Sequence, residues 1–181
     1  MDIDQKLYRE FLAGNMKSFD KLVDKYRNTL ISFITTFIRK NDLAEDLAQD
    51  VFVYILMNKK EYDFKFSMKT YLYTIAKSRA INYLNKNKRI LYIEDYPTKD
   101  IEIYQTEEQF MVNENKRKIH NAIKNLNTNQ QRIIYLVDIE DMSYKETAKI
   151  MDISIPQVKM TLYRARKKLK DILEKEELKH G

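Results

Sequence analysis

Hydrophobic residues recur at helical spacing along most of the chain. The residues of the longest such face follow one another at alternating intervals of three and four positions. They are Met16, Phe19, Val23, Tyr26, Leu30, Phe33 and Phe37. This period is that of one side of a long amphipathic α-helix. Residues 3–12 can form a short helix before it, and Gly14 lies where that helix would end.

Two further helices are predicted in the first half of the chain. Asp42 and Glu45 have the spacing of a capping box and predict a helix over about residues 42–58. Its expected buried stripe is Leu43, Leu47, Val51 and Tyr54. Residues 59–66 interrupt the pattern and predict a loop. Ser67 can cap a helix to about Asn87, which would place Met68, Leu72, Ile75, Ala76 and Tyr83 on one side.

Four shorter helical segments are predicted in the second half. The first covers about residues 107–125, and each of the others follows a Ser or Thr with Gln or Glu three positions later. These capping pairs are Thr128 with Gln131, Ser143 with Glu146, and Ser154 with Gln157. Pro156 falls in the first turn of the last helix, where its missing N–H costs nothing.

The stretch between the two halves, residues 90–106, contains Pro97 and no sustained helical period, so we predict a linker there. The chain has only 2 Gly and 2 Pro, too few for the hairpins of a many-stranded fold. The expected fold is therefore all-α, with two small helical domains joined by an acidic linker. We expect an N-terminal helical bundle over 1–89, the linker over 90–106, and a four-helix domain with a helix-turn-helix over 107–181.

The charge distribution adds a candidate function to this outline. The net charge is +6, and residues 77–89 carry five basic side chains and no acid. Residues 155–170 carry six basic side chains and no acid, whereas residues 90–110 carry six acids and one Lys. Two basic blocks separated by an acidic stretch predict two phosphate-binding surfaces, the alternative being two solvated helix faces.

Composition also excludes several classes of protein. The chain has no Cys, which excludes disulfides and thiolate metal sites. Its longest uncharged run, Asn28 to Ile38, has 11 residues, whereas a membrane span needs about 20. The N-terminus lacks the apolar core of a signal peptide. We expect a cytoplasmic protein with no membrane span.

Residues 143–170 have the pattern of a helix-turn-helix. Ala148 is a small residue suited to a close helix crossing, and Ser154 can cap the second helix. On that helix an apolar stripe lies opposite polar and cationic side chains, the layout of a recognition helix in the major groove, although a plain amphipathic helix with a basic face is the alternative. The residues predicted to bind duplex DNA are Ser154, Gln157, Lys159, Met160, Thr161, Tyr163, Arg164, Arg166, Lys167 and Lys168.

Aromatic and basic residues interleave in the loop at 59–66 and in the helix after it. Aromatic rings stack on unpaired bases and cations follow the backbone, so this pattern predicts single-strand binding; the alternative places many of these rings in the core. The candidate residues are Lys59, Lys60, Tyr62, Phe64, Lys65, Lys69, Tyr73 and Lys77.

Residues from Leu126 through Leu173 resemble the C-terminal promoter-binding domain of extracytoplasmic-function (ECF) sigma factors. The matching pieces are Gln131-Arg132, Ser143-Tyr144-Lys145-Glu146-Thr147-Ala148, Val158-Lys159 and Arg164-Ala165-Arg166-Lys167-Lys168-Leu169. The chain departs from the family pattern at Asn127, where Pro is common, and at Pro156-Gln157, where Gly-Thr is common. The second departure lies on the expected reading face and therefore concerns the DNA element that is read.

The N-terminal half resembles the same family in two places. Residues 42–52 are similar to its polymerase-binding helix, which docks on the coiled coil of the largest catalytic subunit, and residues 69–84 are similar to its promoter-melting segment. Asn82 replaces a usual Asp in the second stretch. The helical period and this resemblance together predict a polymerase-binding face made of Glu45, Asp46, Gln49, Asp50, Phe52 and Val53.

The resemblance implies an RNA polymerase sigma factor that binds core polymerase and directs promoter recognition and opening during transcription initiation. It implies no enzymatic activity, cofactor or metal. The expected partners are core RNA polymerase, promoter DNA as duplex and as melted single strand, and an anti-sigma factor. Two alternatives are a conventional helix-turn-helix regulator that binds operator DNA without polymerase, and a carboxylate-metal enzyme using Glu45, Asp46 and Asp50.

Overall fold

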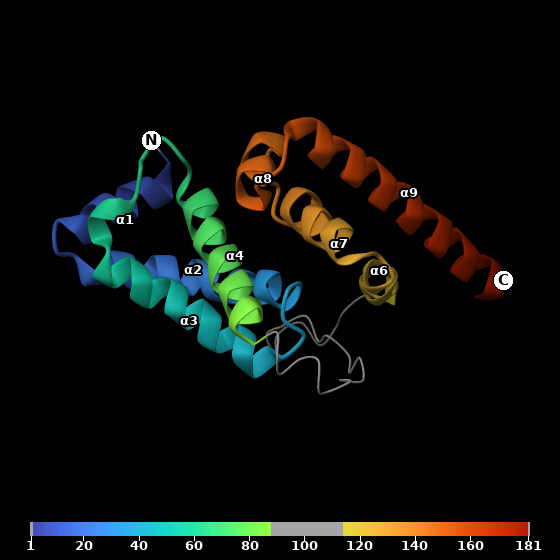
Figure 1. Cartoon of the computed structure of the whole chain (residues 1–181), viewed down its shortest axis with the longest axis horizontal. Coiled ribbons are helices and arrows are strands. Elements are labelled where there is room, and N and C mark those ends of the chain that lie inside the picture. The colour runs from blue at the N-terminus through green and yellow to red at the C-terminus, as the bar shows by residue number, and fades with distance from the viewer. Residues whose placement is uncertain (1, 88–113, 181) are drawn as a thin grey trace. The chain divides into compact units, whose positions relative to one another are not determined.

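The computed structural model describes residues 2–87 and 114–180, and every regular element within these ranges is a helix (Figure 1). The expectation of an all-α fold is thereby confirmed. The chain divides into two compact units, Met1–Tyr104 and Gln105–Gly181. The linker predicted at 90–106 lies outside the described residues.

The first unit is a helical bundle arranged around one central helix. Its elements are α1 (Ile3–Leu12), α2 (Met16–Thr35), α3 (Asn41–Met57), a short 3-10 turn η1 (Lys59–Glu61) and α4 (Met68–Lys86). Helix α2 contacts α1, α3 and α4. Gly14 has a φ of +100° between α1 and α2, a left-handed conformation that glycine adopts without steric cost. The predicted end of the first helix at this residue is confirmed.

Aromatic rings connect α2 to each of its neighbours. The Phe19 ring stacks on Phe11 of α1 with centroids 4.6 Å apart and meets the edge of Phe52 of α3 at 6.3 Å. Phe33 lies 5.0 Å from the ring of Tyr73 in α4. Of the predicted face of α2, Phe19, Tyr26, Leu30 and Phe33 are buried, whereas Val23 is half-buried and Met16 is exposed. Phe37 is buried but follows the end of the helix at Thr35.

The buried side of α3 is wider than predicted and rotated from it. Leu47 and Val51 are buried as expected, whereas Leu43 and Tyr54 are only half-buried. The remaining buried positions are Ala44, Ala48, Phe52 and Ile55. Because α3 contacts both α2 and α4, it buries two adjacent stripes, and its two fully buried alanines permit close helix approach. The predicted Asp42 cap was also wrong: α3 begins at Asn41, so Asp42 lies within the helix.

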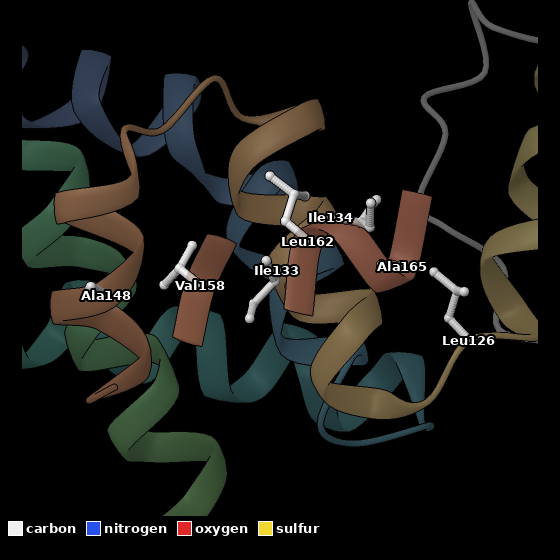
Figure 2. Packing of buried hydrophobic residues seen from close by; sticks show 7 residues of the cluster. All are labelled: Leu126, Ile133, Ile134, Ala148, Val158, Leu162 and Ala165. Atoms are coloured by element: carbon white, nitrogen blue, oxygen red, sulfur yellow. The ribbon is translucent and has the colours of Figure 1, made fainter. Parts of the chain in front are cut away.

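The second unit consists of α6 (Glu114–Lys124), α7 (Thr128–Ile134), a π-helical turn η3 (Tyr135–Ile139), α8 (Tyr144–Met151) and α9 (Ile155–His180). Helix α9 contacts α8, α7 and α6 (Figure 1). Side chains from α7, α8, α9 and the α6–α7 connection meet in one apolar core, shown in Figure 2. The residues of this core are Leu126, Ile133, Ile134, Ala148, Val158, Leu162 and Ala165.

Helix starts in this unit follow the predicted capping chemistry with one shift. The Ser143 hydroxyl accepts from the Glu146 N–H and the Glu146 carboxylate accepts from the Ser143 N–H, which confirms that capping box. The same reciprocal pair joins Ser154 and Gln157. The box predicted at Thr128 and Gln131 was wrong, because Asn127 caps α7 and pairs with Gln130 instead. The Gln131 side chain is buried, and its amide donates to the Leu126 carbonyl oxygen at 2.8 Å.

The position of the α7 cap at Asn127, one residue before the predicted Thr128, can be tested directly. We expect Asn127→Ala to lower the free energy of unfolding by about 1 kcal/mol, because it removes the side chain that satisfies the Gln130 N–H at the helix start. The matched change Thr128→Ala removes an exposed side chain inside the first turn and should be nearly neutral. Chemical denaturation of the full chain measures both, and a larger loss for the threonine variant would contradict the observed cap.

Candidate polymerase and nucleic-acid interfaces

Helices α8 and α9 form the predicted helix-turn-helix, and three residues join them. Asp152 adopts a left-handed conformation with φ 58° at the end of α8, a conformation that Asp tolerates better than most residues. The next N–H, of Ile153, donates to the Ala148 carbonyl oxygen at 3.1 Å, which closes the helix end. Ala148 is buried against Val158, so the small residue lies at the crossing as expected.

The rotation of α9 separates its apolar and cationic sides. Val158, Leu162 and Ala165 are buried, and the side chains between them face away from this core. Thr161 is half-buried, and Ser154 is exposed but serves as the helix cap. The exposed members of the predicted duplex-binding set are Gln157, Lys159, Met160, Tyr163, Arg164, Arg166, Lys167 and Lys168.

Arg166 differs from the other cations of the predicted duplex-binding set because an acid in the same unit holds it. Its Nε donates to Asp138 Oδ2 at 3.2 Å and its Nη2 donates to the other carboxylate oxygen. These hydrogen bonds to Asp138 raise the pKa of Arg166 above its usual range. The two-point contact ties the π-helical turn η3 to α9 and offsets the charge of Arg166. Asp138 was not predicted, because nothing in the local sequence connects two residues so far apart.

Four of the six residues predicted to form a polymerase-binding face on α3 are exposed. Asp46, Gln49, Asp50 and Val53 are exposed. Glu45 is half-buried, with its carboxylate 3.5 Å from the Arg27 guanidinium of α2.

Phe52 was wrongly placed on that exposed face. It is 7% exposed and its ring meets the Phe19 ring of α2. The physical reason is the second buried stripe of α3, which follows from its contacts with two helices. Val53 is the exposed apolar residue of the predicted set, at 50%, and Met57 one turn further along α3 is 80% exposed.

In the loop predicted to bind single-stranded DNA, the lysines are exposed and one tyrosine is buried. Lys59, Lys60 and Lys65 are exposed, whereas Phe64 is half-buried. Tyr62 is 5% exposed, and its hydroxyl donates to the Phe66 carbonyl oxygen at 2.6 Å. Its expected role in stacking on a base is therefore wrong for this conformation.

The helix after the loop requires a second correction. Tyr73 was predicted to face DNA but is fully buried beside Phe33, because α4 turns this side toward α2. Lys69 and Lys77 of the same helix are half-buried. The alternative that placed many of these aromatic rings in the core is correct for Tyr62 and Tyr73.

The tyrosines around the loop stay protonated at neutral pH. Burial raises the pKa of Tyr71 to about 12 and also raises the pKa of Tyr62. Their rings lie 5.1 Å apart. Neutral phenols add no negative charge near the exposed lysines, so the acids of the loop are Glu61 and Asp63, both exposed.

Two residues of α1 that hydrogen-bond to the backbone of this loop were not predicted from the sequence. Gln5 and Tyr8 of α1 donate hydrogen bonds to carbonyl oxygens of the loop more than fifty positions away along the chain. Neither residue belongs to a recognisable motif. Only the packing of α1 beside the loop brings them together.

Within 2–87 and 114–180, no three Asp, Glu or His side chains come together in a way that could hold a metal ion. Across the same part of the chain, none of the helices combines the length and apolar character of a membrane span.

Comparison with known proteins identifies both halves of the chain. Residues 22–90 match the family model described as Sigma-70 region 2, and residues 116–169 match the model described as Sigma-70, region 4. The first range contains α3, the loop and α4, and the second contains the helix-turn-helix.

Curated relatives match along nearly their whole length. The ECF RNA polymerase sigma factor SigX of Bacillus subtilis is 32% identical over 164 residues, covering 87% of this chain and 84% of the relative. The ECF RNA polymerase sigma-E factor of Haemophilus influenzae is 28% identical over 178 residues, covering 93% and 94%.

Solved structures share the fold. The sigma factor RpoE of Bartonella quintana, solved with the anti-sigma factor NepR, has a TM-score of 0.72 at 23% identity and covers 87% of this chain and 98% of that one. CnrH, solved with the cytosolic domain of CnrY, has a TM-score of 0.66 at 22% identity and covers 96% and 98%.

A region 2 match together with a region 4 match does not favour a conventional helix-turn-helix regulator, which has no need of a polymerase-binding half. The resemblance noted in the sequence is confirmed by the SigX relationship. The chain belongs to the ECF subfamily of sigma-70 type RNA polymerase sigma factors, which bind core polymerase and direct promoter recognition and opening during transcription initiation.

Proposed function

We propose that this sigma factor divides promoter recognition among three of its own surfaces while core RNA polymerase supplies all the chemistry. The exposed acidic face of α3 binds core polymerase, α9 reads duplex DNA, and the loop after α3 holds the melted strand. The observation that supports this division most strongly is the cationic side of α9 over residues 155–170, which carries no acid and lies opposite the buried Val158, Leu162 and Ala165. We infer a cytoplasmic location, where core polymerase and promoter DNA are both present.

The α3 surface consists of Asp46, Gln49, Asp50 and Val53, with Glu45 at its edge. Acidic side chains beside an exposed apolar residue suit a basic protein surface and repel DNA. Glu45 is already paired with Arg27, so we assign the main electrostatic contribution to the two exposed aspartates.

The α9 surface is proposed to enter the major groove with its N-terminal turns. Gln157, Met160 and Thr161 lie early on the helix and are placed to reach base edges. Arg164, Lys167 and Lys168 follow and are proposed to hold phosphates, together with Lys159 and Tyr163. Arg166 is left out of the phosphate set because Asp138 occupies its guanidinium.

The loop surface is proposed to hold the non-template strand through Lys60 and Lys65, with Phe64 as the candidate stacking ring. Lys69 and Lys77 are retained as candidates along the same path. A base must leave the duplex stack before a protein pocket can read it, and cations nearby stabilise the exposed backbone. The acidic segment 90–106 is proposed to link this surface with the duplex-binding domain and to stay off DNA.

An anti-sigma protein is the further partner that we propose. RpoE of Bartonella quintana was solved with the anti-sigma factor NepR, and its fold covers most of this chain. A partner of this kind would act by covering the α3 or α9 surface and so blocking access to polymerase or promoter.

Promoter-dependent transcription tests the proposed function as a whole. We expect purified protein mixed with core RNA polymerase to yield transcripts from discrete start sites in a genomic DNA library, and neither component to do so alone. Tight binding to a palindromic operator by the free protein, without association with polymerase, would instead indicate a conventional regulator.

Charge reversal tests the docking surface. We expect the double variant Asp46→Lys with Gln49→Lys to lose association with core polymerase, because two cations would then face a basic partner surface. The control Asp24→Lys reverses an exposed acid on α2 and should bind normally. Co-purification with core enzyme measures both, and unimpaired binding by the double variant would move the docking surface elsewhere.

Salt dependence tests the assignment of the cations on α9. We expect Arg164→Ala to reduce the slope of log affinity against log salt concentration by about 1, as for the loss of one phosphate contact. Arg166→Ala should leave the slope nearly unchanged, since that cation is paired within the protein. Binding of the holoenzyme to a promoter found in the transcription assay is measured over a salt series. Equal slopes for Arg164→Ala and the unaltered protein would remove Arg164 from the phosphate contacts.

A further inference from the structure

Helix α1 holds the backbone of the loop between α3 and α4. The side-chain amide of Gln5 donates to the Phe64 carbonyl oxygen at 3.0 Å and to the Phe66 carbonyl oxygen at 3.2 Å. The same nitrogen lies 3.3 Å from the Tyr62 hydroxyl. One side chain therefore joins three points of the loop, two of them on its backbone.

Tyr8 makes a second connection one helical turn further along α1. Its hydroxyl donates to the Lys59 carbonyl oxygen at 2.8 Å, at the start of the loop. Its ring is fully buried and meets the rings of Tyr62 and Phe64, with centroids 5.0 Å and 6.1 Å away. Gln5 and Tyr8 lie on one face of α1, because residues three apart are neighbours on a helix.

The helix that carries these residues is itself fixed independently of the loop. Asp4 is 3% exposed, and both of its carboxylate oxygens accept from Lys25 Nζ of α2, at 2.7 and 2.8 Å. The Tyr26 hydroxyl donates to the same carboxylate. Because α1 is attached to α2 by a buried charged group, the loop rests on a rigid support.

The contacts on the loop also decide which of its side chains remain available. The Arg9 guanidinium lies 4.2 Å from the centroid of the Phe64 ring and covers one of its faces. Lys59 Nζ lies 4.8 Å from the Phe11 ring, which draws this cation toward α1. Lys60 and Lys65 make no such contact in the described structure and are exposed. The Tyr62 ring also lies 4.6 Å from the Phe64 centroid. These contacts thus leave the exposed part of the half-buried Phe64 ring and two lysines for a ligand.

From these contacts we propose that Gln5 and Tyr8 are positioning residues for single-strand recognition. They hold the loop backbone so that Phe64, Lys60 and Lys65 are presented to an extruded base and its phosphates. This inference rests on the proposed function of the loop. Neither residue touches the DNA, and their contribution is to the shape of the loop before the strand arrives.

The experiment uses holoenzyme and a DNA whose sequence need not be known in advance. The probe is a duplex with a short unpaired stretch that is randomised on the non-template strand. Bound molecules are sequenced, and the affinity of the preferred sequence is then measured for each variant. Core polymerase affinity and thermal stability of the free variants are measured in parallel.

We expect Gln5→Leu to weaken binding of the preferred probe by about fivefold to tenfold and to flatten the base preference, since it removes hydrogen bonds to the loop carbonyls. Tyr8→Phe removes only a hydroxyl, keeps the ring packing, and should reduce the preference in the same direction. Both variants should retain affinity for core polymerase. The control Lys6→Leu places the same side chain one position away at an exposed site and should bind the probe normally.

The double variant Lys60→Ala with Lys65→Ala separates this inference from the proposed function. If it weakens probe binding while Gln5→Leu and Tyr8→Phe keep the full base preference, the positioning role is wrong and the loop assignment stands. If the lysine variant binds the probe normally, the loop assignment is wrong and the inference falls with it. If Gln5→Leu also loses core affinity through misfolding, the Tyr8→Phe result decides.

Discussion

Val158, Leu162 and Ala165 are excluded from water in the second unit, and their burial fixes the rotation of α9. A helix that buries one stripe must direct the residues between those positions outward. In α9 those residues include Lys159, Thr161 and Arg164 as well as the exposed Met160 and Tyr163, so apolar packing behind the helix orients the surface in front of it. The proposed DNA-reading face follows from the core beneath it, and a change in the packing of α7 or α8 against α9 would rotate it.

The same constraint acts differently in the first unit. Helix α3 has neighbours on two sides, α2 and α4, and so buries two stripes. What remains exposed is a strip that carries Asp42, Asp46, Gln49, Asp50, Val53 and Met57. Phe52 lies next to it in sequence but contributes to the core. The proposed docking surface is confined to this strip because α3 contacts a helix on each side. Its acidic character comes from Asp46 and Asp50.

Polar contacts between distant residues complete each candidate site. Gln5 and Tyr8 hold the loop from α1, and Asp138 holds Arg166 on α9. Buried apolar packing places whole helices, but it does not set the conformation of a loop or the direction of one guanidinium. Hydrogen bonds with defined geometry do so, and they connect residues with no relation along the chain.

The sequence alone determined the all-α fold and most helix starts. It also placed the helix-turn-helix with Ser143 and Ser154 as caps, and it pointed to the sigma family. These features depend on residues within a few positions of one another, so the helical period and the capping residues can be recognised in the sequence. The tertiary structure decided the burial of Phe52, Tyr62 and Tyr73, the pairing of Arg166, and the support of the loop by α1. Each of these depends on which neighbour covers a residue, and helical spacing carries no information about a partner fifty positions away.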